Sequence, residues 1–174
     1  MRKSKSLLLF LSFLTSLLFL SCDSKSIPSL LGTWEAEITL KSELGGKDAP
    51  EGLEAFLFTK QKITLSFAEG GVYTKHVVQQ VDRFESNQKI ESTEEEKAYF
   101  SQFFDKDLTF DGEYSQKKSF IVFTVERVQS AGEESLSYMD YFVKDPSIGE
   151  DEITSNYEMK DGFLVLDEVK FKKM

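Results

Sequence analysis

The sequence predicts an all-β domain: an antiparallel up-and-down barrel of about eight strands, with one short helix near residues 93–104. Three observations lead to this prediction. Apolar and polar residues alternate with a period of two in most segments after Leu30. Short turns separate the segments, and short turns join neighbouring antiparallel strands. Closure into a barrel removes exposed sheet edges. A two-sheet sandwich is the competing architecture.

Two strands in the first half of the domain show the alternation most clearly. The apolar positions are Trp34, Ala36, Ile38 and Leu40 in the first strand, and Ile63, Leu65 and Phe67 in the second. Gly70-Gly71 then predicts a tight hairpin turn, because glycine accepts positive φ without steric cost. The next strand is predicted to run to about Phe84. Residues 41–61 read as a long connection, with a candidate helical turn over 51–59.

The predicted helix near residues 93–104 interrupts the strands. Thr93 and Glu96 have the spacing of a capping box, in which each side chain bonds the other residue's backbone amide. An aromatic group follows at helical spacing: Tyr99, Phe100, Phe103 and Phe104. It could cap the barrel core, form a lid over an apolar pocket, or dock a partner or membrane. Core capping is favoured, because exposed aromatic patches are rare on soluble monomers.

The remaining strands are predicted in the second half of the chain. Their approximate ranges are 108–114, 119–128, 136–143, 153–160 and 163–172. Lys160-Asp161-Gly162 predicts a hairpin turn before the last of them. That last strand is expected to place Phe163, Val165, Val169 and Phe171 on one face.

The first residues indicate a secreted precursor. Basic residues near the start precede an uncharged apolar stretch from Leu7 to Leu20, which is typical of a secretory signal and short for a membrane-spanning helix. The stretch ends in Phe19-Leu20-Ser21-Cys22, which resembles the lipobox of bacterial lipoproteins. This resemblance implies that diacylglycerol is joined to the Cys22 thiol. It also implies cleavage before Cys22 and acylation of the new amino group, for example with palmitate.

The resemblance divides the chain into three parts. We expect a signal peptide at residues 1–21, a lipidated tether at 22–29 and the barrel domain at 30–174. Cys22 is the only cysteine, so it can form no disulfide within the chain. The expected location is the bacterial cell envelope, with a lipid anchor in a membrane that the sequence does not specify.

The acidic composition excludes one class of partner. The formal net charge is −9, and loss of the three basic residues in the leader makes it −12. Such a surface does not suit phosphate backbones, so we expect no nucleic-acid binding. The sequence identifies no protein partner.

No group of residues predicts an enzyme, a cofactor or a metal site. His76 is the only histidine and lies in a predicted strand, without the activated nucleophile that a catalytic triad needs. Zinc sites use clustered Cys and His, which this chain lacks. The acidic residues at 105–113 do not follow the ligand series of a calcium loop. We therefore expect a non-enzymatic protein.

Gly32-Thr33-Trp34 at the start of the first strand resembles the Gly-x-Trp motif of lipocalins. Leu30-Leu31 before it, Ala36 after it and the paired strands at the end of the chain fit lipocalin-like lipoproteins. The late strand carries lysines, including Lys173, where lipocalins often have an arginine stacked on the Trp. The resemblance implies a lipocalin-like barrel with a loop over its mouth.

A barrel of this size packs its interior or holds one small ligand. We expect a small apolar ligand inside it. The candidate ligand-binding residues are Trp34, Phe67, Tyr73, Phe110, Tyr138, Phe142 and Tyr157. For Trp34, anchoring of the core is favoured over ligand contact. The alternative is an envelope structural or protein-interaction lipoprotein with a packed, ligand-free barrel.

Overall fold

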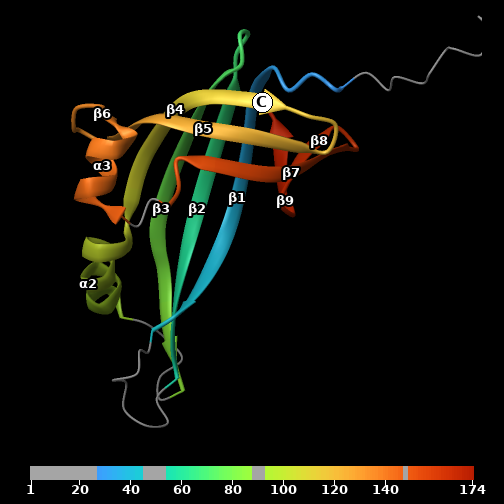
Figure 1. The fold of residues 1–174 in the computed structure, drawn as a ribbon. Coiled ribbons are helices and arrows are strands. Elements are labelled where there is room, and N and C mark those ends of the chain that lie inside the picture. Colours follow the sequence, from blue (N-terminus) through green and yellow to red (C-terminus); the bar gives the residue numbers. More distant parts are fainter. Residues whose placement is uncertain (1–26, 45–53, 88–92, 147–148) are drawn as a thin grey trace, which may run out of the picture.

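The computed structural model describes residues 27–44, 54–87, 93–146 and 149–174. In this part of the chain, eight strands form a closed antiparallel barrel, and a short further strand pairs with one of them (Figure 1). The barrel strands are β1 (Gly32–Glu43), β2 (Ala55–Phe67), β3 (Val72–Ser86), β4 (Lys106–Gln116), β5 (Phe120–Ser130), β7 (Glu152–Lys160), β8 (Phe163–Leu166) and β9 (Val169–Lys173). The other elements are β6 (Leu136–Ser137), α2 (Glu94–Phe104) and α3 (Tyr138–Lys144).

Each barrel strand pairs with the barrel strands that precede and follow it in the chain. All these pairings are antiparallel, and β9 returns to pair with β1. The short strand β6 pairs only with β5 and stands outside the ring. The domain is therefore an up-and-down barrel, which confirms the predicted fold class and excludes the two-sheet sandwich.

Closure of the barrel is confined to one end of its three longest strands. β9 pairs with β1 only at Trp34 and Glu35, and β4 pairs with β3 only as far as Gln79. Beyond these points β1, β2 and β3 continue as a three-stranded extension, which points away from β7–β9 in Figure 1. The closed part of the molecule is consequently shorter than its longest strands.

Helix α2 packs beside the extension, along the edge of β3. The capping box is confirmed, because the Thr93 hydroxyl accepts from the Glu96 amide while the Glu96 carboxylate accepts from the Thr93 amide. Phe100 stacks on Phe84 of β3 with ring centroids 5.2 Å apart. Asp105, just after the helix, accepts a hydrogen bond from the Val81 amide at 2.7 Å. This segment thus occupies the β3 edge beyond the point where β4 pairing ends.

Residues 136–143 differ from the sequence prediction. They form only a two-residue strand, β6, followed by helix α3. The Ser137 hydroxyl accepts from the Asp140 amide and so provides the N-cap. Tyr138, Tyr141 and Phe142 then follow helical spacing, with both tyrosines buried. The aromatic content suggested a strand, whereas the cap and the spacing determine a helix.

Two further predictions are wrong in their details. Residues 55–59 of the candidate helical turn belong to strand β2, while 51–53 lie outside the described residues. The expected last strand over 163–172 is a hairpin of β8 and β9, whose turn residues Asp167 and Glu168 both have positive φ. Because this turn reverses the chain, Leu164, Leu166 and Phe171 are the buried residues there.

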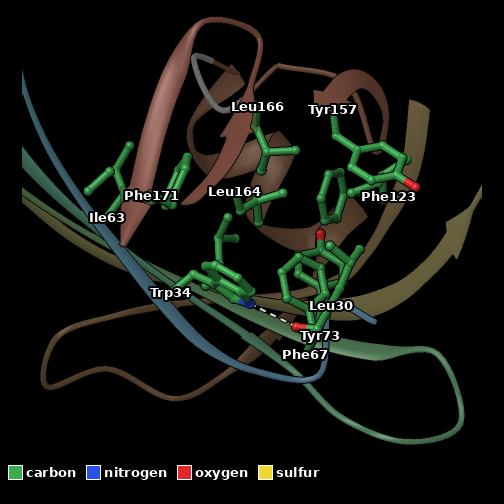
Figure 2. Close-up of a cluster of buried hydrophobic side chains, with 13 residues drawn as sticks. Leu30, Trp34, Ile63, Phe67, Tyr73, Phe123, Tyr157, Leu164, Leu166 and Phe171 are labelled. Carbon is green, nitrogen blue, oxygen red and sulfur yellow. Dashed lines mark hydrogen bonds between the residues drawn. The ribbon is translucent and has the colours of Figure 1, made fainter. Parts of the chain in front are cut away.

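The barrel core is dominated by one cluster of buried side chains, which comes from seven of the barrel strands and the segment before β1 (Figure 2). Trp34 is 1% exposed, and its Nε1 donates to the Leu30 carbonyl oxygen at 2.7 Å. The Lys173 ammonium lies 5.2 Å from the centre of the Trp34 ring. A second, smaller cluster lies where the α3 residues Tyr138 and Tyr141 pack against β4 and β5.

A bulge in β5 separates these two clusters. Asp111 pairs with Arg127 and Gly112 pairs with Val125, so Glu126 is the extra residue. The buried side of β5 therefore changes parity after Val125. A Cβ atom on Gly112 would lie 1.9 Å from the Thr124 carbonyl oxygen, which leaves no space for any other residue there.

Candidate functional site

A cavity of about 220 Å³ lies inside the barrel, next to α3. Most of its wall is apolar. The apolar wall includes Ile63, Leu65, Phe110, Phe123, Val125 and Phe171. Three other lining residues, Glu150, Ile153 and Asp167, are exposed and mark where the cavity meets solvent. Concave apolar sites with a few convergent polar groups are the usual form of small-molecule sites.

One cationic side chain lines this apolar cavity. Lys75 of β3 pairs with Leu65 of β2 on one side and with Phe110 of β4 on the other, so the three side chains form one row across the barrel wall. All three line the cavity. The Lys75 ammonium lies 5.8 Å from the centre of the Phe110 ring. Burial lowers the pKa of Lys75 from its ordinary value of 10.5.

Tyr73 lies two residues before Lys75 and faces the same interior. It is 2% exposed and packs edge-on against Phe123, with ring centroids 4.9 Å apart (Figure 2). Burial, and to a lesser degree the negative charge of Asp111, raises the pKa of Tyr73 to about 12. The phenol is therefore protonated at neutral pH and can donate a hydrogen bond.

The other polar lining groups lie toward the mouth of the cavity. Asp167 accepts a hydrogen bond from the Asn156 amide at 2.9 Å, which fixes its carboxylate in the turn between β8 and β9. The Tyr138 hydroxyl donates to the Gly149 carbonyl oxygen and so ties α3 to the segment before β7. Glu150 follows directly. Burial, assisted by the charges of Asp151 and Glu150, raises the pKa of Tyr138.

The structure separates the seven predicted ligand-binding residues into two groups. Tyr73, Phe110 and Tyr138 line the cavity. Trp34, Phe67 and Tyr157 belong to the buried core and do not line the cavity, while Phe142 packs against the smaller cluster beside α3.

Sequence reasoning missed the residue that makes this cavity unusual. Tyr73 was placed on the inner face of its strand, and strand alternation puts Lys75 on that same face. The signal was therefore present, but a lysine inside an apolar row runs against the usual rule for buried residues. Ser155 and Glu150 were also missed: Ser155 shares a strand face with Tyr157 but is polar, and Glu150 lies in the loop before that strand.

The aromatic residues of α2 do not line this cavity. Phe100 and Phe104 are half-buried against β3, whereas Tyr99 and Phe103 are 59% and 61% exposed. The exposed pair makes an edge-on contact with ring centroids 5.4 Å apart. Helix α2 contains no buried residue, and none of its aromatic side chains belongs to either core cluster. The predicted capping of the core is therefore wrong, and α2 is not a lid for this cavity.

The remaining residues with possible chemistry lie elsewhere. His76 faces outward and makes a 2.7 Å contact with Asp107 on β4. Within the described residues, no three His, Cys, Asp or Glu side chains are arranged to hold a metal ion. No helix in the described ranges is both long and apolar enough to cross a bilayer. Cys22 and the signal sequence lie outside the described residues.

Comparisons of this chain with protein-family models, with curated proteins and with solved structures found no match. The fold is an eight-stranded antiparallel β-barrel. The resemblances to lipocalins and to bacterial lipoproteins rest on the short motifs of the sequence alone and stay predictions.

Proposed function

We propose that this protein is a lipid-anchored envelope lipoprotein whose barrel binds a small apolar ligand. The single observation that carries the ligand-binding part is the cavity of about 220 Å³ with its largely apolar wall. A closed barrel of eight strands has room inside for side chains or for one small ligand. In this barrel the side chains leave a space that is continuous with exposed residues at its mouth.

The size of the cavity limits the ligand. At about 30 Å³ for each water-sized group, 220 Å³ accommodates roughly seven such groups. Small-molecule sites usually measure about 300–1,000 Å³. A compact apolar molecule, or the terminal part of a longer chain that leaves through the mouth, fits this space.

Calorimetric titration of the full chain with 1-hexanol, 1-octanol and 1-decanol tests this proposal. Saturable binding with one site is expected. The substitution Val125→Phe fills the cavity from its wall and should weaken binding of every alcohol, while Val122→Phe makes the same change on the opposite face of β5 and serves as the control. Absence of saturable binding by any of the alcohols contradicts the proposal.

Attachment to a membrane is proposed from Cys22 and the residues before it. Two or three acyl chains on one residue give stable anchoring, because each buried CH₂ contributes about 0.8 kcal/mol. The substitution Cys22→Ala should abolish metabolic labelling with radioactive palmitate and release the protein from membranes. A variant that still fractionates wholly with membranes would contradict the lipid anchor.

A second candidate function is a protein interaction in the envelope. The observation that favours it is the exposed pair Tyr99 and Phe103 on α2. Replacing both residues with serine should leave thermal unfolding nearly unchanged and remove partners that crosslink to the wild-type chain in membranes. An unchanged set of crosslinked proteins excludes α2 as the docking element.

A further inference from the structure

The charge inside the cavity is unusual for a protein this acidic. The chain has 30 acidic residues and 21 basic ones. The charged side chain between Leu65 and Phe110 on the cavity wall is nevertheless a cation, Lys75. Lys75 is half-buried, and partial removal of an unpaired charge from water is unfavourable. The position of Lys75 therefore calls for an explanation.

No protein group in the described residues neutralises this ammonium. The ammonium lies 5.8 Å from the centre of the Phe110 ring, and among the described residues it forms no ion pair or hydrogen bond. The carboxylates that line the same cavity, Glu150 and Asp167, are exposed at its mouth, and neither forms an ion pair with Lys75. The lowered pKa of Lys75 has burial as its cause, with no offset from a carboxylate.

A second donor lies on the same wall of the cavity. Tyr73 precedes Lys75 by two residues on the inner face of β3, so the two side chains are neighbours along one strand. Within the described part of the chain, the Tyr73 hydroxyl has no hydrogen-bond partner. One cationic donor and one neutral donor on the same wall match the two oxygens of a carboxylate.

We propose that the ligand is an anionic amphiphile, a medium-chain carboxylate, whose headgroup binds Lys75 and Tyr73 while its alkyl chain fills the apolar cavity. This inference rests on the proposed ligand-binding function and defines the class of ligand. The carboxylate supplies the negative charge that the wall lacks. The alkyl chain contacts Leu65, Phe123 and Val125. With room for roughly seven water-sized groups, the cavity matches the alkyl chain of octanoate in volume.

The competing explanation is purely structural. Long lysine side chains can cover apolar surface with their methylene groups while the ammonium reaches water. In that arrangement Lys75 would be a cavity wall whose charge contributes nothing to ligand choice. The two explanations differ in one measurable quantity, the preference for a carboxylate over a neutral headgroup of the same chain length.

Calorimetric titrations of the full chain in detergent-free buffer at pH 7 measure this preference. The probes are octanoate, 1-octanol and octylamine, which share an alkyl chain and differ in headgroup charge. Octanoate should bind roughly tenfold or more tightly than 1-octanol, as expected for a charge-assisted hydrogen bond in an apolar site. Octylamine, which brings a second cation beside Lys75, should bind more weakly than 1-octanol.

Four variants show how far the ammonium and the Tyr73 hydroxyl each contribute to the preference. Lys75→Met removes the charge at similar length and should abolish the preference for octanoate without weakening 1-octanol. Lys75→Arg retains the charge and should keep part of the preference. Lys160→Met makes the same charge change at an exposed position of β7 and should bind all three probes as the wild type does. Tyr73→Phe should reduce the preference by a smaller factor.

The outcomes separate this inference from the function on which it rests. Equal affinity for octanoate and 1-octanol in the wild type overturns the assignment to carboxylates and leaves the apolar site intact. A preference that survives in Lys75→Met overturns the role of Lys75. If none of the probes binds, the proposed ligand-binding function fails as well. The wild-type comparison needs no variant, so it stands even if a substitution impairs folding.

Discussion

Lys75 combines a site for a ligand with a local loss of stability. Its ammonium lies among apolar side chains of β2 and β4 and has no carboxylate partner in the described residues. Burial that disfavours the charged form also disfavours folding when the lysine is charged. Residues that bind a ligand often reduce stability in this way, because their charges have a partner only when the ligand is bound.

We predict that Lys75→Met raises the free energy of unfolding of the ligand-free protein at pH 7 by on the order of 1 kcal/mol. Methionine fills a similar volume without a charge. The folded-state pKa of Lys75 is lowered from 10.5. The destabilisation of the folded wild-type protein by the charged Lys75 is therefore fully present below the folded-state pKa, and it disappears as the pH approaches 10.5. Urea unfolding at several pH values between 7 and 10.5 should show the gain shrinking as the pH rises. A gain that grows with pH would contradict this explanation.

Trp34 anchors the core in the same row as Lys75, because it pairs with Leu65 of β2 and Leu65 pairs with Lys75. It is 1% exposed, and its indole nitrogen donates to the Leu30 carbonyl oxygen at 2.7 Å. The bond ties the segment before β1 to the core, so the ring both fills space and holds the chain at the start of the barrel (Figure 2).

We predict that Trp34→Ala lowers the free energy of unfolding by about 3–5 kcal/mol, as is usual when a buried aromatic residue is truncated. Trp34→Phe should lower the free energy of unfolding by less, because it keeps an aromatic ring in the core. Some loss remains, since the Leu30 carbonyl oxygen no longer has its donor. Far-ultraviolet circular dichroism during urea unfolding measures both, since each variant lacks the only tryptophan. A change below 1 kcal/mol in Trp34→Ala would show that the ring is not an anchor.

Individual residues were predictable where they obey the strand pattern. Alternation placed Trp34 and Leu65 on the apolar faces of their strands, Tyr73 was a candidate ligand-binding residue, and all three are buried. It could not show which inward side chains surround empty space, because that depends on how strands far apart in sequence pack. Trp34 belongs to the packed core. Lys75, which strand alternation also places inside the barrel, lines the cavity.

Among the elements, the bulge in β5 has the sharpest steric requirement. The extra residue, Glu126, brings the β5 backbone over Gly112 of β4, where a Cβ atom would lie 1.9 Å from the Thr124 carbonyl oxygen. The contact is with backbone rather than with a movable side chain. Strands β4 and β5 would have to separate to admit any larger residue at this position. Both strands also contribute to the cavity wall near Val125.

We predict that Gly112→Ala lowers the free energy of unfolding by about 3 kcal/mol or more, at the upper end of overpacking effects. Gly132→Ala provides the matched control, because a Cβ at Gly132 meets nothing within 4 Å. Its φ of 77° makes that change unfavourable by about 1 kcal/mol. Thermal unfolding of both variants compares the two effects. Equal losses would show that the close approach at Gly112 is relieved without disturbance of the strands.

Element types were predictable where a local signal was strong and wrong where two signals conflicted. The Thr93–Glu96 capping box predicted α2, and its reciprocal hydrogen bonds are present. For α3, aromatic residues favoured a strand, while the Ser137 cap and helical spacing favoured the observed helix. The turn at Asp167 and Glu168 was missed because both residues have positive φ without being glycine.

At the scale of the whole molecule, the ring of strands is closed by a short seam. β9 pairs with β1 at Trp34 and Glu35, next to a further bond from the Met174 amide to the Thr33 carbonyl oxygen. β9 also supplies Phe171, which is 3% exposed and lines the cavity. The last residues of the chain therefore complete both the barrel and its site.

We predict that a chain ending at Asp167 loses cooperative unfolding. Without β9, both β8 and β1 present unpaired edges, and the core loses a buried aromatic side chain. Near-ultraviolet circular dichroism should weaken, and the protein should aggregate on concentration. Met174→Ala, which keeps the amide that bonds Thr33 and changes an exposed side chain, is the control and should unfold in one sharp transition. A truncated chain that unfolds like the full one would show that the seam is dispensable.

The two carboxylates at the cavity mouth, Glu150 and Asp167, have a kinetic consequence for a ligand of the proposed class. An anion that arrives from solution meets repulsion from these groups, and from the net negative charge of the chain, before it reaches Lys75. Added salt screens exposed charges more than buried ones. Octanoate should accordingly enter faster as ionic strength rises, while its residence time changes little. The protein would then bind such molecules slowly, and salt would only weakly screen the contact between the ligand carboxylate and Lys75 that holds them.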